Sequence, residues 1–155
     1  MKKLITMTLV IAVFILSVSF TAYARNISVI LDGKEVRMDV PPQIINGRTM
    51  VPIRAVTEAM GCEVKWDPHT KSIDVTYWYE GGYAAVLMWI DDKEVVAYSS
   101  SGGDEVEYET IYVDAPPVIV NGRTLVPLRL IAEAFGYDVW WNEGERTVYI
   151  INPNL

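Results

Sequence analysis

The stretch PPQIINGRTMVPIRAVTEAMGCEVKWD, residues 41–67, returns as PPVIVNGRTLVPLRLIAEAFGYDVWWN, residues 116–142. Every matched position is displaced by 75 residues, as Asn46 and Asn121 illustrate. An internal repeat of this length decides the architecture, because both copies must form the same local structure. A residue kept in both copies serves a need that both share, most often packing or a turn. A residue that differs marks where an asymmetric function could lie.

Each copy predicts a hairpin followed by a short helix. Asn46-Gly47 is a type I′ turn signal between two short strands. Pro52 suits the first helical position, because its missing N–H would be unpaired there. Apolar residues follow at helical spacing, and Gly61 is expected to end the helix in the left-handed conformation. The same features recur 75 residues later.

An entry hairpin is expected before the first copy. Residues 27–31 alternate toward the type I′ signal Asp-Gly at 32–33, and residues 36–40 alternate on the return. Its sequence LDGKEV resembles IDDKEV at residues 90–95, but with an offset of 59 rather than 75. The difference of 16 predicts an insertion at about residues 97–112, a Ser/Gly-rich and then acidic segment that forms either an exposed loop or an extra polar hairpin.

A closing hairpin is expected after each helix, with Trp66 facing Ile73 and Lys65 facing Asp74 across the strands. The expected fold class is therefore α+β, with antiparallel β hairpins and two short helices. We expect two half-repeats, residues 26–78 and 85–151, within one domain.

The N-terminus has the pattern of a secretory signal peptide. Two lysines precede an apolar run, residues 4–20, which ends in the small-x-small sequence AYA. An uncleaved anchor is the alternative, because the run approaches the roughly 20 residues that span a bilayer. The cleavage site favours a signal peptide at residues 1–24, a secreted domain at residues 25–155 and no stable membrane insertion after cleavage.

Charge and cysteine content narrow the choice of partners. The chain has 20 acidic and 13 basic residues, a net charge of −7 that becomes −9 without residues 1–24. This balance argues against nucleic acid and against anionic membrane surfaces as partners.

Cys62 is the sole cysteine, so no disulfide can form within the chain. Stability must come from an ordinary apolar core.

The repeated pattern ppxIinGRTlVPlRxiaEAxGxxVxW resembles the copper amine oxidase-like N-terminal domain, also called the stalk domain, of secreted and cell-surface proteins of Gram-positive bacteria. The resemblance covers essentially the whole chain after the signal. It implies an α+β domain that comprises both half-repeats and that carries neither copper nor the quinone cofactor of the oxidases. We expect no catalytic domain, because the chain ends at Leu155 directly after the last expected strand.

The polar residues kept in both copies are expected to be structural. The pairs Arg54/Glu58 and Arg129/Glu133 have i, i+4 spacing on a helix, which is worth only about 0.2–0.5 kcal/mol. An anionic ligand bound to both arginines is the functional alternative. The full set of repeat-matched structural residues is Asn46, Gly47, Arg48, Pro52, Arg54, Glu58, Gly61, Trp66, Asn121, Gly122, Arg123, Pro127, Arg129, Glu133, Gly136 and Trp141.

Catalytic, cofactor and metal sites are not expected. His69 is the sole histidine and lies in a predicted turn, which disfavours both a copper or zinc site and histidine-assisted nucleophilic catalysis. Cys62 corresponds to Tyr137 in the second copy, and we interpret it as a free, partly buried thiol. Arg48 and Arg123 are expected to bind nearby carbonyl groups.

Aromatic residues give the main asymmetry between the copies. Trp66 and Trp141 are shared and are therefore expected in the core. In the closing hairpin, Lys65 and Asp74, an expected surface ion pair, become Trp140 and Tyr149. Exposed, flat, amphipathic rings suit stacking on sugars or a partner protein. The alternative is that these rings cover other aromatic residues of the chain. The predicted ligand-binding face consists of Trp140, Tyr149, Trp78 and Trp89.

The sequence predicts a secreted, non-catalytic module that binds cell-wall polysaccharide or a surface protein, or that acts as an extracellular spacer. A small extracellular hydrolase, or a regulator of one, is the second hypothesis. It would need an acid pair in a cleft, which the sequence does not place. Structural self-association through the aromatic face is the third hypothesis.

Overall fold

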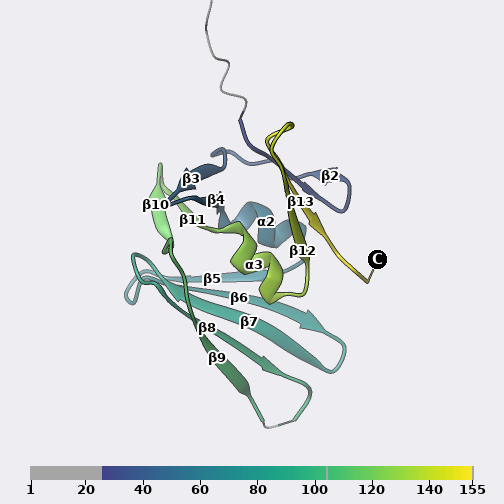
Figure 1. The fold of residues 1–155 in the computed structure, drawn as a ribbon. Coiled ribbons are helices and arrows are strands. Elements are labelled where there is room, and N and C mark those ends of the chain that lie inside the picture. The colour runs from purple at the N-terminus through teal and green to yellow at the C-terminus, as the bar shows by residue number, and fades with distance from the viewer. Residues whose placement is uncertain (1–25, 104, 155) are drawn as a thin grey trace, which may run out of the picture.

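The computed structural model describes residues 26–103 and 105–154, so the predicted signal peptide lies outside the described residues. Three β-sheets surround two short helices, α2 (Ile53–Ala59) and α3 (Leu128–Ala134), and both helices contribute side chains to the main core (Figure 1). The fold is α+β and mostly antiparallel, as the sequence predicts. Within the described ranges no helix has the length and apolar character needed to cross a membrane.

The first sheet joins the two ends of the described chain. Its strand order is β12 (Asp138–Asn142), β13 (Thr147–Ile151), β1 (Ser28–Leu31) and β2 (Lys34–Glu35). β1 runs parallel to β13, with Val29 beside Val148. The Asp32-Gly33 turn forms as predicted, with φ angles of 46° and 78°. The strand predicted over residues 36–40 is wrong: the assigned strand ends at Glu35, and the Val36 N–H adds one last hydrogen bond to the Val29 carbonyl at 2.9 Å. The chain then leaves the sheet and carries Val40 into a second apolar cluster.

The second sheet is built from the two repeated Asn-Gly hairpins. Its order is β10 (Val118–Val120), β11 (Arg123–Pro127), β4 (Arg48–Pro52) and β3 (Gln43–Ile45). Asn46 and Asn121 have φ angles of 50° and 51°, which the predicted type I′ turns require. β4 and β11 pair antiparallel at the centre, with Val51 beside Val126. The two copies therefore meet along a shared pair of strands.

The third sheet is a five-stranded antiparallel meander. Its order is β5 (Glu63–Asp67), β6 (Ser72–Tyr79), β7 (Gly82–Trp89), β8 (Glu94–Ser100) and β9 (Glu107–Tyr112). The predicted insertion at residues 97–112 forms most of the β8–β9 hairpin, with Tyr98 opposite Tyr108. Of the two predicted forms of this segment, the polar hairpin is the one observed.

The helices begin and end at the predicted signals, with one shift. Pro52 and Pro127 are N-cap residues that still belong to β4 and β11, so each helix starts one residue later than predicted. Gly61 has a φ angle of +80° and lets the Cys62 N–H donate to the Thr57 carbonyl at 2.8 Å. Gly136 closes α3 in the same way, with a φ angle of +79°.

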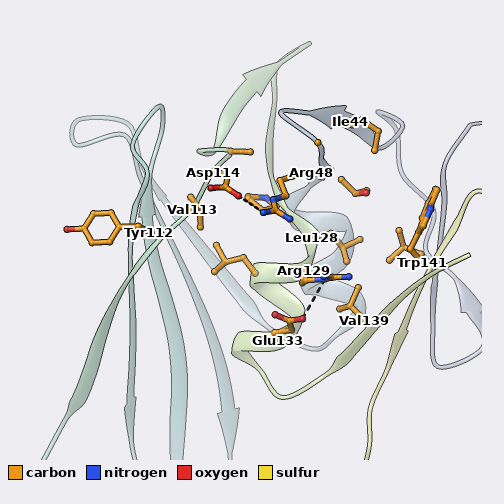
Figure 2. A pocket seen from close by; sticks show the side chains of 16 residues that line it. Ile44, Arg48, Tyr112, Val113, Asp114, Leu128, Arg129, Glu133, Val139 and Trp141 are labelled. Atoms are coloured by element: carbon orange, nitrogen blue, oxygen red, sulfur yellow. Dashed lines mark hydrogen bonds and ion pairs between the residues drawn. The ribbon is translucent and has the colours of Figure 1, made fainter. Parts of the chain in front are cut away.

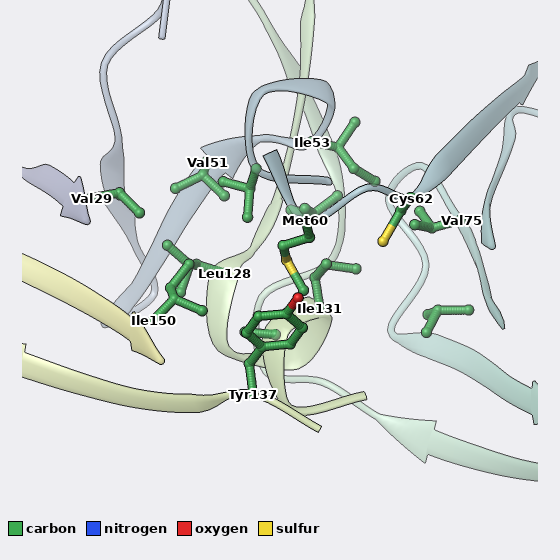
Figure 3. Packing of buried hydrophobic residues seen from close by; sticks show 14 of the residues in the cluster. Val29, Val51, Ile53, Met60, Cys62, Val75, Leu128, Ile131, Tyr137 and Ile150 are labelled. Carbon is green, nitrogen blue, oxygen red and sulfur yellow. The ribbon is translucent and has the colours of Figure 1, made fainter. Parts of the chain in front are cut away.

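A single main core collects residues from all three sheets and both helices. Met60 of the first copy and Ile131 and Tyr137 of the second belong to this core (Figure 3). Val29 and Val75 bring in the first and third sheets. Because the copies share one core, neither has an apolar interior of its own.

The element order β3–β4–α2–β5–β6 recurs as β10–β11–α3–β12–β13. The strands before the two blocks differ, however: β1 pairs in parallel with β13, whereas β7 pairs antiparallel with β6. The half-repeat boundaries at residues 26–78 and 85–151 therefore stay a prediction.

Candidate functional site

Two pockets lie on the described surface, and their lining residues match at the offset of the repeat. One has a volume of about 510 Å³ and the other of about 600 Å³. Each of the 14 residues that line the larger pocket has its counterpart, 75 positions away, among the 16 that line the smaller one. Volumes of this size suit small ligands or parts of larger ones. A variant in one pocket therefore has a matched variant in the other pocket that can serve as its control.

The smaller pocket, here named the paired pocket, has each of its two arginines matched with an acid (Figure 2). Arg48 forms an ion pair with Asp114, and Arg129 with Glu133 at 3.6 Å. Trp141 lines the pocket from β12. Its other lining residues are Ile44, Gly47, Thr49, Tyr112, Val113, Ala115, Pro127, Leu128, Leu130, Val139 and Val148.

The larger pocket, here named the arginine pocket, holds three arginines. Arg123 pairs with Asp39 at 2.5 Å. Arg54 and Glu58 were expected to pair as Arg129 and Glu133 do, but no ion pair within 4.0 Å joins them in the described structure, so that prediction is wrong for the first copy. The remaining lining residues are Arg37, Pro52, Ile53, Ala55, Val64, Trp66, Ile73, Ile119, Gly122 and Thr124.

Both pockets are composite. The arginine that follows the Asn-Gly turn of one copy reaches an aspartate that precedes the Pro-Pro of the other copy. The Arg48 guanidinium holds the pKa of Asp114 below its ordinary value, chiefly by a hydrogen bond. Arg123 does the same for the pKa of Asp39. The main partners of these arginines are carboxylates rather than the predicted carbonyls, although Arg123 also donates to the Gly122 carbonyl at 3.3 Å.

The outer face of the five-stranded sheet carries four rings that we name the aromatic row: Trp78, Tyr83, Tyr98 and Tyr108. Side chains alternate between the faces of a strand, and Ile73 on β6 points into the core, so Trp78 points outward. The ring centroids of Trp78 and Tyr83 are 5.3 Å apart, and those of Tyr83 and Tyr98 are 6.0 Å apart. Tyr98 faces Tyr108 across β8 and β9. The row crosses from β6 to β9, about 14 Å at ordinary strand spacing.

The aromatic row combines exposed ends with an anchored middle. Trp78 is 60% exposed and Tyr108 78% exposed. Ala85, which faces Tyr98 across the strands, is only 2% exposed although it lies on the outer face, so neighbouring side chains cover it. The Tyr98 hydroxyl donates to Asp74 Oδ2 at 2.8 Å. Burial and this hydrogen bond raise the pKa of Tyr98, which keeps the hydroxyl protonated.

The structure separates the four aromatic residues predicted as one face. Trp140 and Tyr149 face each other on the first sheet, with ring centroids 5.2 Å apart, and Trp140 is 57% exposed. Trp78 belongs to the aromatic row on the third sheet. Trp89 shares that outer face but lies six residues along β7 from Tyr83, about 20 Å away.

The strand register of both closing hairpins is confirmed, but the predicted Lys65–Asp74 ion pair and the predicted burial of Trp66 are wrong. Lys65 faces Asp74 as predicted, yet its amine pairs with Glu63 at 3.5 Å, because Asp74 accepts the Tyr98 hydroxyl on the side of β7 and β8. Trp66 was expected in the core and is 38% exposed, since it lines the open arginine pocket. Trp141 is half-buried against the core.

The remaining chemically active side chains offer little for catalysis. Cys62 is a free thiol, as predicted, but it is buried rather than partly buried, and burial raises its pKa to about 11. A thiol with this pKa is a poor nucleophile at neutral pH. His69 is exposed in its turn, where its backbone N–H donates to Asp67 at 2.8 Å. Over residues 26–103 and 105–154 no group of three or more His, Cys, Asp or Glu side chains could hold a metal ion.

Sequence reasoning missed several residues of these surfaces. Tyr98 and Tyr108 lie in the segment predicted as a loop or hairpin, so their register could not be assigned. The arginine pocket uses Arg37 and Asp39, which lie just before the quoted repeat. The signal for Asp39 was available, because the sequence DVPP recurs as DAPP at the same offset of 75.

Residues 30–150 match the family model described as the copper amine oxidase N-terminal domain. The chain belongs to this family. The domain is a non-catalytic module. The resemblance drawn from the repeated motif is thereby confirmed.

A similar protein is described as a protease inhibitor from Brevibacillus choshinensis. It is 24% identical over 117 residues, which are 74% of this chain and 31% of the relative. The chain therefore spans about a third of the length of that relative. No solved structure matches the chain.

Proposed function

We propose that this protein is a secreted, non-catalytic module that binds a neutral cell-wall polysaccharide on the aromatic row. The observation that carries the proposal is the row itself: aromatic side chains on four neighbouring strands, with both ends exposed. The first three rings are in contact, and Tyr108 faces Tyr98 across the strands. Exposed aromatic rings offer apolar faces to a sugar at little cost in side-chain entropy. A platform of about 14 Å suits an oligosaccharide rather than a single sugar.

Charge favours a neutral glycan over an anionic one. The chain has a net charge of −7, so an anionic polymer would be repelled. Asp74 lies on the same face as the aromatic row, and its carboxylate is a strong acceptor for hydroxyl groups. A protein partner remains the alternative ligand for the same face.

The proposal includes two half-repeats that act as one folded unit without enzyme activity. The shared core and the two composite pockets support the single unit. Membership of a family whose domain is non-catalytic, and the high pKa of the Cys62 thiol, support the absence of catalysis.

A second candidate is binding to a protease, as a regulator of hydrolysis. The protease inhibitor from Brevibacillus choshinensis favours it, because the similarity covers 74% of this chain. The two candidates differ in their ligand, so titration of a panel of extracellular proteases with the purified chain separates them. Loss of protease activity at stoichiometric amounts would favour this second candidate.

Cosedimentation with insoluble peptidoglycan tests the main proposal. The mature chain should sediment with it, and the double variant Trp78→Ala, Tyr108→Ala should lose most binding, since an aromatic anchor commonly contributes about 2 kcal/mol or more, roughly thirtyfold in affinity. The control is Trp140→Lys, Tyr149→Asp, which removes comparable aromatic area from another sheet and installs the pair of the first copy. Equal binding by all three proteins would contradict the proposal. A size measurement of the free chain on the same samples separates glycan binding from self-association.

A further inference from the structure

The arginine pocket has an excess of positive charge in an acidic chain. It contains Arg37, Arg54 and Arg123 against Asp39 and Glu58, an excess of one positive charge. The whole chain carries a net charge of −7. In the paired pocket the same count is two arginines and two acids, because Tyr112 stands where the arginine pocket has Arg37. The two matched pockets therefore differ in net charge, which is zero in the paired pocket and one positive charge in the arginine pocket.

The three arginines of the arginine pocket differ in their ion pairs within the described structure. Arg123 is held by Asp39, with its Nε 2.6 Å from the carboxylate. Arg54 and Arg37 make no ion pair within 4.0 Å in the part of the chain that the structure describes, although Arg54 has Glu58 one helical turn away. The counterpart of Arg54 in the paired pocket, Arg129, does pair with its glutamate. Two guanidinium groups are thus open to an anion.

An apolar wall lies beside these open arginines. Ile53 and Ile73 are almost fully buried at 5% and 1% exposure. Val64 lines the same pocket, and Trp66 leaves 38% of its surface exposed there. The volume of about 600 Å³ admits a side chain of the ligand together with its charged group.

We propose that the arginine pocket binds a carboxylate attached to an apolar or aromatic group. The planar guanidinium matches a carboxylate in a two-point hydrogen bond, and Arg37 and Arg54 supply this contact. Trp66 and the apolar wall receive the apolar group. A single carboxylate charge matches the excess of one positive charge, whereas a phosphate would carry more charge and leave the wall uncovered. This ligand, from either a polypeptide C-terminus or a free amphipathic acid, is distinct from the glycan proposed for the aromatic row.

Titration of the mature chain with N-acetylphenylalanine, followed by NMR of the tryptophan indole N–H signals, tests this inference. The Trp66 signal, assigned with Trp66→Phe, should shift, and N-acetylphenylalaninamide should shift it little because it lacks the charge. Arg54→Gln should weaken binding about tenfold or more, the range expected for a charge-assisted hydrogen bond. The matched variant Arg129→Gln should change it less than about twofold, since Arg129 lies in the other pocket.

Both arginines are exposed, so both variants should keep the wild-type melting temperature, which is measured as a check on folding. Equal binding of the acid and the amide would overturn the proposal. So would equal losses in Arg54→Gln and Arg129→Gln, or displacement of the acid by an equal concentration of inorganic phosphate. A pentapeptide ending in phenylalanine distinguishes the sources: binding as tight as that of the acid assigns the pocket to polypeptide C-termini, and weaker binding to free acids.

Discussion

Ile131→Ala should destabilise the entire domain in one transition. Ile131 is 1% exposed in the main core. The change removes three carbon atoms, about 2.4 kcal/mol at about 0.8 kcal/mol for each buried methylene. The cavity left behind adds to this, which places the loss of unfolding free energy at about 3–4 kcal/mol. Val56 is the matched residue of the first copy, and Val56→Ala should cost less, because it removes two carbons.

Urea unfolding followed by both far-ultraviolet circular dichroism and tryptophan fluorescence measures this change. Tryptophans lie in both copies, Trp66 in the first and Trp141 in the second, so the fluorescence reports on both. The two probes should give one coincident transition for the wild type and for each variant, with the midpoint lowered and the slope unchanged. Two transitions, or a loss below about 1 kcal/mol for Ile131→Ala, would refute the shared core.

Three further predictions follow from local features. A fragment of residues 26–80 should fail to fold alone, because its core is completed by the second copy, and a sharp thermal transition of the fragment would contradict this. Burial raises the pKa of Cys62 from 9.0 to about 11, so the folded state holds the thiol proton more tightly. The contribution of this thiol to the unfolding free energy should be full below about pH 9 and be lost between pH 9 and 11, and Cys62→Ala should make the decline of stability over that range shallower. Gly82→Ala should destabilise the β7–β8 pair, since its Cβ would collide with the Ser100 carbonyl oxygen. Gly144→Ala should leave the melting temperature nearly unchanged, because its Cβ would only reach ordinary van der Waals contact with Asn142 Oδ1, at 3.5 Å.

Local signals predicted the repeated elements well. The Asn-Gly turns and the glycine helix ends depend on neighbours in sequence, and Asn46 and Gly61 adopt the backbone angles expected of them. The register of the closing hairpins followed from the alternation of side chains, so Lys65 was placed opposite Asp74 correctly. These features need no knowledge of distant parts of the chain.

Contacts between distant segments could not be read from the pattern. β1 pairs in parallel with β13, so the two ends of the described chain lie in one sheet. A turn signal predicts only the pairing of neighbouring strands and therefore could not predict this one. The presence of Trp in both copies, at Trp66 and Trp141, was interpreted as core packing, but both residues line the matched pockets. The aromatic row depends on the register of β8 and β9, which places Tyr98 opposite Tyr108. Both residues lie in the insertion, which has no counterpart in the first copy, so the repeat could not predict this register.

Isothermal titration calorimetry with a soluble neutral oligosaccharide of N-acetylglucosamine tests the central claim most directly. Stacking on the aromatic row predicts saturable binding whose affinity changes little between low and high salt, since no charge pair is involved. Tyr108→Ala should weaken this binding by roughly thirtyfold. Absence of heat at saturating oligosaccharide, or undiminished affinity in Tyr108→Ala, would contradict glycan binding by this face.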